Sequence, residues 1–492
     1  MNILLIYPEF PDTFWSFKHA LKFVGKRAIL PPLGLLTVAA LLPRDWALRL
    51  VDTNVQRLTK SDLAWADYAF VSAMVVQRES AGLIIARCKD SGLRVVAGGP
   101  LFMNDHERFA TVDHFVLNEA ELTLPAFLED LAKGDPQHIY ISHRFADLRQ
   151  TPLPRWELLD LKRYAGMSIQ FSRGCPFHCD FCNVTALLGH KVRTKTSRQV
   201  IDELDNLYKL GWRDEVFFVD DNFIGNKAVL KTDLLPALIE WRKGKKDLLF
   251  ITEASIDLAD DKQLMSLMVE AGFNKVFVGI ETPEEECLVE CTKQQNRNRN
   301  LVEDVKSIQR MGLEVQAGFI VGFDHDKPSV FQKQIDFIQR SGIVTAMVGI
   351  LQAPPGTRLY ERLEKEGRIL EDSSGDNVDG TTNIVPKMNL EVLRSGHKSI
   401  LQNIYAPEAF YRRVKTFLRE YRPPKRRGSL RFSHLMALVL SLCRFGILSH
   451  ARLHYWRLLL WTQFRRPGLV RDAITLTICG YHFRKISERH AA

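Results

Sequence analysis

Three cysteines, Cys175, Cys179 and Cys182, lie within one short stretch of this 492-residue chain and carry its clearest chemistry. An apolar run over 167–171, typical of the end of a buried strand, precedes them, so all three thiols can converge on a metal centre from one loop. A structural zinc site or a closed iron–sulfur cluster normally takes four protein ligands. No fourth cysteine follows nearby, and three thiolates on a [4Fe-4S] cube leave one iron open to an outside ligand.

Two other interpretations of this loop stay open. His178 or His190 would complete a zinc site, or the three thiols would be unrelated core side chains. The remaining parts of the chain decide between these interpretations and an iron–sulfur cluster.

The cysteine spacing, the aromatic Phe181 before the last cysteine and the strand in front of the loop resemble the radical S-adenosylmethionine family. The resemblance implies that the three cysteines are both the metal ligands and the catalytic centre. In that family the amino and carboxylate groups of S-adenosylmethionine chelate the open iron. An electron from the cluster then cleaves the molecule to a 5′-deoxyadenosyl radical.

The region from residue 166 to 389 alternates strands and helices, which predicts a partial (β/α)6 barrel with its chemistry at the carboxyl ends of the strands. The expected strands are 167–171, 216–219, 249–252, 275–279, 314–320 and 346–351, and helices begin near residues 197, 227, 260, 297 and 329. The side chains at these strand ends are Asp221, Glu253, Ser255, Glu281 and Gly318.

The family resemblance implies a role for each strand end. Asp221 would hold the methionyl amino group, Glu253, Ser255 and Glu281 would reach the amino group or the ribose hydroxyls, and Gly318 would line the adenine. The alternative for each carboxylate is a helix N-cap or a surface ion pair.

Over residues 1–137, short apolar runs alternate with helical stretches, which predicts a doubly wound, flavodoxin-like parallel sheet. Its expected strands are 3–7, 48–52, 68–72, 94–97 and 114–117. A ligand of such a sheet lies beyond the carboxyl ends of the strands. The candidate binding residues there are Pro8, Thr53, Ser72, Gly98, Gly99 and Glu119.

In this order, and directly before a radical loop, these strand ends resemble the cobalamin-binding domain of cobalamin-dependent radical S-adenosylmethionine enzymes. The Asp-x-His-x-x-Gly signature of classical cobalamin enzymes is absent, as it is in that subfamily. Residues 74–77 would face the lower side of the corrin, whereas His19 is expected to pack or meet solvent rather than bind cobalt.

Several other residues allow two interpretations. Arg193 and Lys195 would meet the S-adenosylmethionine carboxylate or a cobalamin side chain, or would form a solvated basic turn. Cys287 and Cys291, four residues apart, are expected to be buried small side chains rather than a second metal site.

Composition excludes some classes of function. Much of the net charge of +9 follows residue 411, in 412–413, 422–427 and 465–466, so the charge does not indicate a nucleic-acid partner. The eight cysteines, three in the loop and five scattered, do not look like a disulfide framework, and an oxygen-sensitive cluster favours a reducing cytoplasm. The first residues are typical of a strand and not of a signal peptide.

The tail, 390–492, has helical periodicity and interleaves aromatic and basic residues around 455–466. Its longest apolar run, 435–442, is shorter than the ~20 residues that span a bilayer. One interpretation is a helical cap on the barrel. The other is an amphipathic surface that rests on the inner face of a membrane or admits a lipid-like substrate.

We therefore predict a cobalamin-binding domain (1–137), a linker (138–165), a radical barrel (166–389) and a helical extension (390–492). The runs 219–226, 252–255 and 279–283 resemble the subgroup that includes the hopanoid C-2 methyltransferases. The resemblance implies a [4Fe-4S] cluster, S-adenosylmethionine and cobalamin as cofactors, and a flavodoxin or ferredoxin as electron donor. The implied reaction is methylation of an unactivated carbon of a small or lipid-like metabolite. A non-methylating radical cyclase or rearrangement enzyme, and a redox sensor, are the alternatives.

Overall fold

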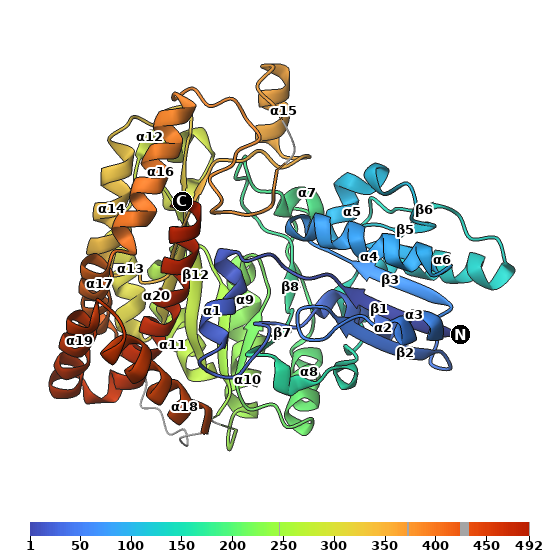
Figure 1. Cartoon of the computed structure of the whole chain (residues 1–492), viewed down its shortest axis with the longest axis horizontal. Helices are drawn as coiled ribbons and strands as arrows, with labels where there is room; N and C mark the ends of the chain where they lie inside the picture. Colours follow the sequence, from blue (N-terminus) through green and yellow to red (C-terminus); the bar gives the residue numbers. More distant parts are fainter. Residues whose placement is uncertain (246, 371–372, 424–431, 492) are drawn as a thin grey trace.

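Two parallel sheets and a helical C-terminal region follow one another along the chain (Figure 1). The structure is a computed structural model that describes residues 1–245, 247–370, 373–423 and 432–491. The predicted fold class, an α/β chain with a helical extension, is confirmed. Residues 424–427 of the predicted basic run lie outside the described residues.

The first sheet has six parallel strands in the order β2-β1-β3-β4-β5-β6. Its first strand in sequence is buried on both faces, because Ile3, Leu4, Leu5 and Ile6 are all fully buried. The chain order reverses at β1, so the loops after β1 and β3 diverge and leave a crevice at the carboxyl edge. The strands are β1 (Asn2–Tyr7), β2 (Ala47–Asp52), β3 (Tyr68–Ser72), β4 (Arg94–Gly98), β5 (His114–Val116) and β6 (Ile139–Tyr140).

Five helices cover this sheet, namely α2 (Leu33–Leu41), α3 (Lys60–Trp65), α4 (Arg78–Asp90), α5 (Pro100–Asp105) and α6 (Ala120–Lys133). The two-residue strand β6 was not predicted. It pairs with β5 and so carries the sheet into the segment that was predicted to be a linker. The domain boundaries stay a prediction.

The second sheet is the predicted six-stranded partial barrel, in the order β14-β13-β12-β11-β10-β7. Side chains alternate between its two faces. Val216 and Phe218 of β10 are buried under the helices, whereas Phe217 between them points inward and is partly exposed. The strands are β7 (Gly166–Ile169), β10 (Glu215–Phe218), β11 (Leu249–Glu253), β12 (Phe273–Glu281), β13 (Glu314–Val321) and β14 (Ala346–Ile350).

The barrel helices are α8 (Ser197–Lys209), α9 (Lys227–Val229), α10 (Leu235–Trp241), α11 (Lys262–Ala271), α12 (Glu285–Glu290), α13 (Leu301–Met311) and α14 (Val330–Ser341). Two short strands, β8 (Ser172–Arg173) and β9 (Arg193–Thr194), pair antiparallel and enclose α7 (Val184–Leu188). The helix α15 (Arg358–Lys365) follows the last strand. Because β8 ends two residues before Cys175, this small sheet closes the base of the cysteine loop.

The predicted helical extension is made of α16 (Leu390–Ile404), α17 (Pro407–Glu420), α18 (Phe432–Ser441), α19 (Arg452–Arg465) and α20 (Val470–Ala491). These helices pack on the outside of the barrel, next to α14 (Figure 1). Within the described ranges, no helix combines the length and the apolar character needed to cross a membrane.

The segment after β1 leaves the first sheet and lies against the barrel and the C-terminal helices. Figure 1 shows its short helix α1 (Lys18–Leu21) beside α20, far from the strand β1 that it follows in sequence. The ring of Phe14 stacks on that of Phe483 at 4.2 Å, and His482 Nε2 donates to the Phe14 carbonyl oxygen at 2.9 Å. The last helix of the chain therefore fixes a loop that begins at the crevice of the first sheet.

Candidate functional site

The loop that carries Cys175, Cys179 and Cys182 is held from several sides. Gly174 has a φ of +93°, and a Cβ there would approach the Lys191 carbonyl oxygen to 2.7 Å, so only glycine fits. The Cys175 N–H donates to the Gly189 carbonyl oxygen at 3.2 Å. On the other side, the Asp180 N–H donates to the Cys291 carbonyl oxygen at 3.1 Å. The loop is therefore shaped by its backbone before any metal binds.

Two amides from the barrel donate to the thiol sulfurs. Asn222 Nδ2 lies 3.9 Å from Cys175 Sγ, and Gln295 Nε2 lies 3.7 Å from Cys179 Sγ. All three cysteines are free thiols and are partly exposed. Amide donors to sulfur and partial exposure suit thiolate ligands of an iron–sulfur cluster, whose potential is tuned by such hydrogen bonds.

The zinc interpretation finds no support in this loop. Within the part of the chain that the structure describes, no three His, Cys, Asp or Glu side chains lie close enough together to hold a single metal ion. His178 and His190 stack on one another with ring centroids 4.2 Å apart. Three cysteine ligands are the number that a [4Fe-4S] cube with one open iron takes from the protein.

Asp220 and Asn222 connect the cysteine loop to the barrel. They flank Asp221 in the run at the end of the second barrel strand, which the family resemblance assigns to the methionyl amino group, and the structure gives them contacts that the sequence did not predict. The Asp220 carboxylate is fully buried and accepts hydrogen bonds from the Phe171 N–H at 3.0 Å and from Ser172. The Asn222 carboxamide oxygen lies 3.3 Å from both the N–H and the hydroxyl of Ser255. Ser255, a predicted site residue, is thus linked to Cys175 through Asn222.

Two predicted carboxylates, Asp221 and Glu253, face the barrel interior and form no ion pair with another described residue. The Asp221 carboxylate accepts a hydrogen bond only from its own backbone N–H among the described residues. Asp221 is exposed at its surface but has much protein around it. The resulting desolvation raises the pKa of Asp221 to about 6. Desolvation, with repulsion from Asp221 and Asp220, raises the pKa of Glu253 to about 8. A carboxylate whose pKa is raised by desolvation and that has no cationic partner suits the binding of a ligand cation or of hydroxyl groups.

Glu281 and Gly318 lie near the predicted rim, but the structure gives Glu281 a partner. Its Oε1 lies 2.7 Å from Lys293 Nζ, and both side chains are almost fully buried. The carboxylate folds over Gly279, where a Cβ would approach it to 2.3 Å. At Gly318 a Cβ would approach the Phe277 ring to 3.1 Å, so this glycine accommodates aromatic side chains inside the barrel.

In the first sheet, the predicted residues meet at the crevice. A Cβ at Gly99 would approach Ser72 Oγ to 2.5 Å, and a Cβ at Gly98 would approach the Val116 carbonyl oxygen to 2.6 Å. The Pro8 carbonyl oxygen accepts from Gln77 Nε2 at 2.5 Å, and the Thr53 hydroxyl donates to the Tyr7 carbonyl oxygen at 3.0 Å. These bonds join the ends of β1, β2 and β3.

Glu119 was predicted to face a ligand at the edge of the first sheet, but its carboxylate lies in a network of ion pairs. Its buried carboxylate pairs with Arg173 at 3.0 Å and with Arg193 at 2.9 Å, and Arg173 also pairs with Glu121 at 2.8 Å. Arg173 and Arg193 belong to the small sheet at the base of the cysteine loop. The network therefore ties that loop to the first sheet.

The remaining alternatives can now be compared with the structure. Lys195 is buried and pairs with Glu203, so it is not a solvated turn residue. Cys287 and Cys291 are buried, as expected for core side chains. His19 packs beside Tyr481 and His482 of α20, as expected.

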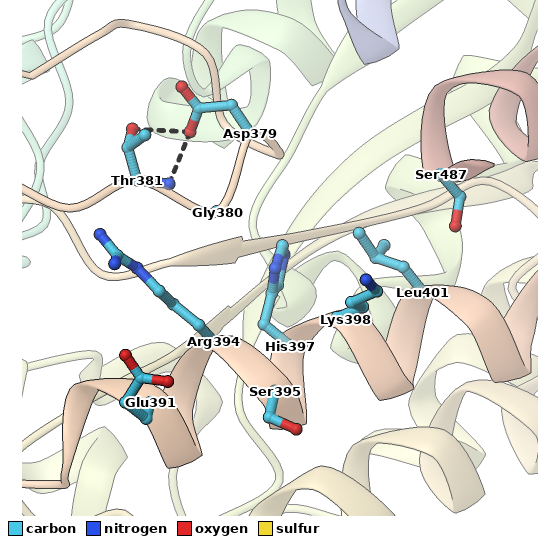
Figure 2. Close-up of a pocket in the computed structure, with 10 residues that line it drawn as sticks. All are labelled: Asp379, Gly380, Thr381, Glu391, Arg394, Ser395, His397, Lys398, Leu401 and Ser487. Atoms are coloured by element: carbon cyan, nitrogen blue, oxygen red, sulfur yellow. Dashed lines mark hydrogen bonds between the residues drawn. The ribbon is translucent and has the colours of Figure 1, made fainter. Parts of the chain in front are cut away.

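A separate pocket of about 470 Å³ lies on the outside of the barrel, between α16 and the 379–381 turn (Figure 2). Of the described residues that line it, none is a predicted site residue. The buried His397 in its floor donates through Nε2 to the Val348 carbonyl oxygen at 2.8 Å, which is a structural contact.

Comparison with known proteins supports the same assignment. The description "Radical SAM superfamily" matches residues 169–338, and "Domain of unknown function (DUF4070)" matches residues 357–492. The chain is 40% identical to an uncharacterized methyltransferase of Synechocystis sp., over 99% of this chain and 92% of that protein. It is 33% identical to the hopanoid C-2 methylase of Rhodopseudomonas palustris, over 100% of this chain and 95% of that one.

Two solved structures share the fold. The radical S-adenosylmethionine enzyme OxsB gives a TM-score of 0.62 at 14% identity, over 99% of this chain and 84% of that chain. The methyltransferase TsrM from Kitasatospora setae gives 0.57 at 16% identity, over 76% and 79%. Because the similarity to named methyltransferases runs the whole length of the chain and includes the cysteine loop, the chain belongs to the radical S-adenosylmethionine superfamily, in the family of methyltransferases that includes the hopanoid C-2 methylase.

Proposed function

We propose that this protein is a cobalamin-dependent radical S-adenosylmethionine methyltransferase that methylates an unactivated carbon of a lipid-like metabolite. The observation that carries the proposal is the loop of three free thiols, joined through Asn222 and Ser255 to a barrel rim with two unpartnered carboxylates. The names of the relatives support methyl transfer. The TsrM and OxsB structures contain bound cobalamin, which supports that cofactor.

The chain's own residues hold and tune the cofactors. When bound, the cluster and S-adenosylmethionine supply a carbon-centred radical, and cobalamin supplies a methyl group. Cys175, Cys179 and Cys182 would hold the cluster, and Asn222 and Gln295 donate to two of the sulfurs. These donors stabilise thiolates and fix the loop against the barrel.

Asp221 and Glu253 would bind the cationic end and the hydroxyls of S-adenosylmethionine. Neither carboxylate has a cationic partner in the described part of the chain, and desolvation raises the pKa of both. A ligand ammonium would favour their ionised forms and would relieve the repulsion between them. Ser255 lies beside them with its hydroxyl on Asn222.

The crevice at the β1/β3 switch point would hold cobalamin. Gly98 and Gly99 pack closely against Val116 and Ser72 and so bring the ends of the neighbouring strands together at this edge, where Met74 after β3 is 44% exposed. A barrel segment also reaches this place, because a Cβ at Gly375 would approach the Val76 nitrogen to 2.7 Å. The loop at 74–77 therefore lies between the first sheet and a segment that follows β14.

An apolar wall inside the barrel supports a lipid-like substrate. The Trp15 ring lies 5.4 Å from the Phe277 ring, and its Nε1 donates to Met347 Sδ at 3.1 Å. These three side chains stay partly exposed, so they line open space. Because the indole donor is already used, the wall offers a substrate no hydrogen bond, which favours a hydrocarbon body over a polar one.

The partners follow from this chemistry. A flavodoxin or ferredoxin would supply the electron, and a small or lipid-like molecule would be the substrate. We also propose peripheral contact with the cytoplasmic face of a membrane through the C-terminal helices.

The proposal is tested on protein purified without oxygen, loaded with cluster and hydroxocobalamin, reduced and given S-adenosylmethionine. Chromatography measures 5′-deoxyadenosine and S-adenosylhomocysteine for the wild type, for Cys179→Ala and for Cys443→Ala, a control at an exposed cysteine outside the loop. We expect both products from the wild type and the control, and no deoxyadenosine from Cys179→Ala. Deoxyadenosine without S-adenosylhomocysteine would favour a radical rearrangement, and neither product from the fully loaded protein with its substrate would contradict an enzymatic role.

A further inference from the structure

A strip of exposed apolar side chains runs along α19 and the turn before it. Leu453, Trp456, Leu460 and Phe464 recur at intervals of three and four residues, so they share one face of the helix, and Phe464 is 81% exposed. Ile447 and Leu448 extend the strip into the turn, where Leu448 is 69% exposed. We call these six residues the apolar strip.

The strip is held rigidly by the opposite face of the same helix. Tyr455, Leu458 and Thr462 are buried, and the Tyr455 hydroxyl lies 2.9 Å from the Ser441 hydroxyl of α18. Trp456 Nε1 donates to the Gly446 carbonyl oxygen at 3.0 Å, which fixes the indole beside the 446–448 turn. The exposed side chains are therefore a formed surface of the folded protein.

The charged side chains in the segment that carries the strip are all basic. The sequence from 421 to 471 contains eleven lysines and arginines and no aspartate or glutamate. Arg444, Arg452, Arg457 and Arg465 are exposed on the same elements. A second copy of this surface would bring like charges together, whereas an anionic lipid surface complements both the charge and the apolar strip.

The position of the strip suits a protein that lies on a bilayer. Figure 1 shows α18 and α19 at one end of the molecule, across the barrel from the first sheet. The structure describes no helix able to span a membrane, so contact would be limited to the interface.

We infer that the apolar strip and its flanking arginines dock this protein on an anionic lipid bilayer. The strip would enter the interface while the arginines meet the lipid phosphates. This surface lies in the C-terminal region of unknown function, and the inference gives that region a role. It also places the enzyme where a lipid-like substrate is found.

Flotation of the cofactor-loaded, full-length protein with vesicles tests this inference. The vesicles are equimolar phosphatidylglycerol and phosphatidylcholine, compared with phosphatidylcholine alone. We expect the wild type to float with the anionic vesicles and to bind them more weakly in high salt, because salt screens the arginines. The double variant Leu448→Glu/Phe464→Glu should bind at least tenfold more weakly.

The matched control is Leu83→Glu, which places the same charge at a similarly exposed leucine of α4, and it should bind like the wild type. Thermal melting checks that each variant is folded. The inference would be overturned if the wild type and the double variant floated equally, or if the wild type did not float. It would also be overturned if the wild type formed dimers that the double variant could not form, because the strip would then be a contact between two copies. Flotation needs no turnover, so a failure of methyl transfer would not affect the flotation result. A failure of flotation would likewise not affect the test of methyl transfer.

Discussion

At the scale of single residues, the site depends on acidic groups that lack partners. Glu253 and Asp221 face the same interior, and desolvation raises the pKa of Glu253 to about 8 and that of Asp221 to about 6. By contrast, Glu281, on the neighbouring strand, is neutralised by Lys293. The structure therefore separates carboxylates that are available to a ligand from one that is already paired.

The raised pKa of Glu253 predicts a pH dependence of S-adenosylmethionine binding. Below its pKa the carboxyl group carries a proton, which must leave before the group attracts the ligand ammonium. Affinity should therefore rise with pH through about 6 and up to about 8, the pKa values of Asp221 and Glu253, and then level off. Equilibrium dialysis of labelled S-adenosylmethionine with cluster-loaded protein measures this profile.

The variant Glu253→Gln should remove the upper part of that rise and weaken binding by about tenfold, because a charged hydrogen-bond acceptor is lost. Glu240→Gln, at an exposed position on α10, is the control. An unchanged profile in Glu253→Gln would show that this carboxylate does not contact the ligand.

At the scale of elements, the cysteine loop depends on two supports, a backbone turn and an ion-pair network. Gly174 lets the chain turn against the 188–191 segment. Glu119 and Glu121 hold the two arginines of the small β8/β9 sheet. Both supports lie outside the thiols themselves, so each can be removed while all three cysteines are kept.

Substituting alanine for Gly174 should reduce cluster binding. A Cβ would overlap backbone oxygens at 2.7 and 2.9 Å, which cannot move without displacing the loop. Gly134→Ala is the matched control, because Gly134 also has a positive φ but has open space around it, so its cost is about 1 kcal/mol of backbone strain. Iron and sulfide content after anaerobic loading measures the effect. Equal iron in both variants would contradict the role of this turn.

Removing the charge of Glu119 should destabilise the protein. Arg173 and Arg193 would lose a buried partner, and breaking a buried ion pair costs about 3 kcal/mol. Differential scanning calorimetry of Glu119→Gln should show a lower Tm, whereas Glu129→Gln, in an exposed pair with Lys133, should change it little. A Tm as high as that of the control would mean that the network contributes nothing to stability.

At the scale of the whole molecule, local pattern predicted the elements, and distant contacts decided several side chains. The strand ends at Asp221, Glu253 and Gly99 were found from the sequence because apolar runs and turns mark where strands stop. The partners of Glu119 lie 54 and 74 residues away in sequence, and no local pattern encodes them.

The same limit hid the role of Trp15. Its partner Met347 is 332 residues away, and the loop that carries it crosses from the first sheet to the barrel. The sequence places Asn222 at the predicted site, because this residue directly follows Asp221 at a strand end. Gln295 could not be identified in this way, because it lies in a segment without a recognisable motif. The parts that the sequence left open are those made by the packing of both sheets with the last helix.

The central claim is that this protein transfers a methyl group to carbon by a radical route. The most direct test gives the loaded, reduced enzyme S-adenosylmethionine with a deuterated methyl group, together with a lipid extract. Mass spectrometry then measures labelled lipid, 5′-deoxyadenosine and S-adenosylhomocysteine. The account predicts all three in equal amounts, dependent on reductant and cobalamin, with neither labelled lipid nor 5′-deoxyadenosine formed by Cys179→Ala. Labelled lipid formed without reductant, or deoxyadenosine formed in step with an unlabelled product, would contradict it.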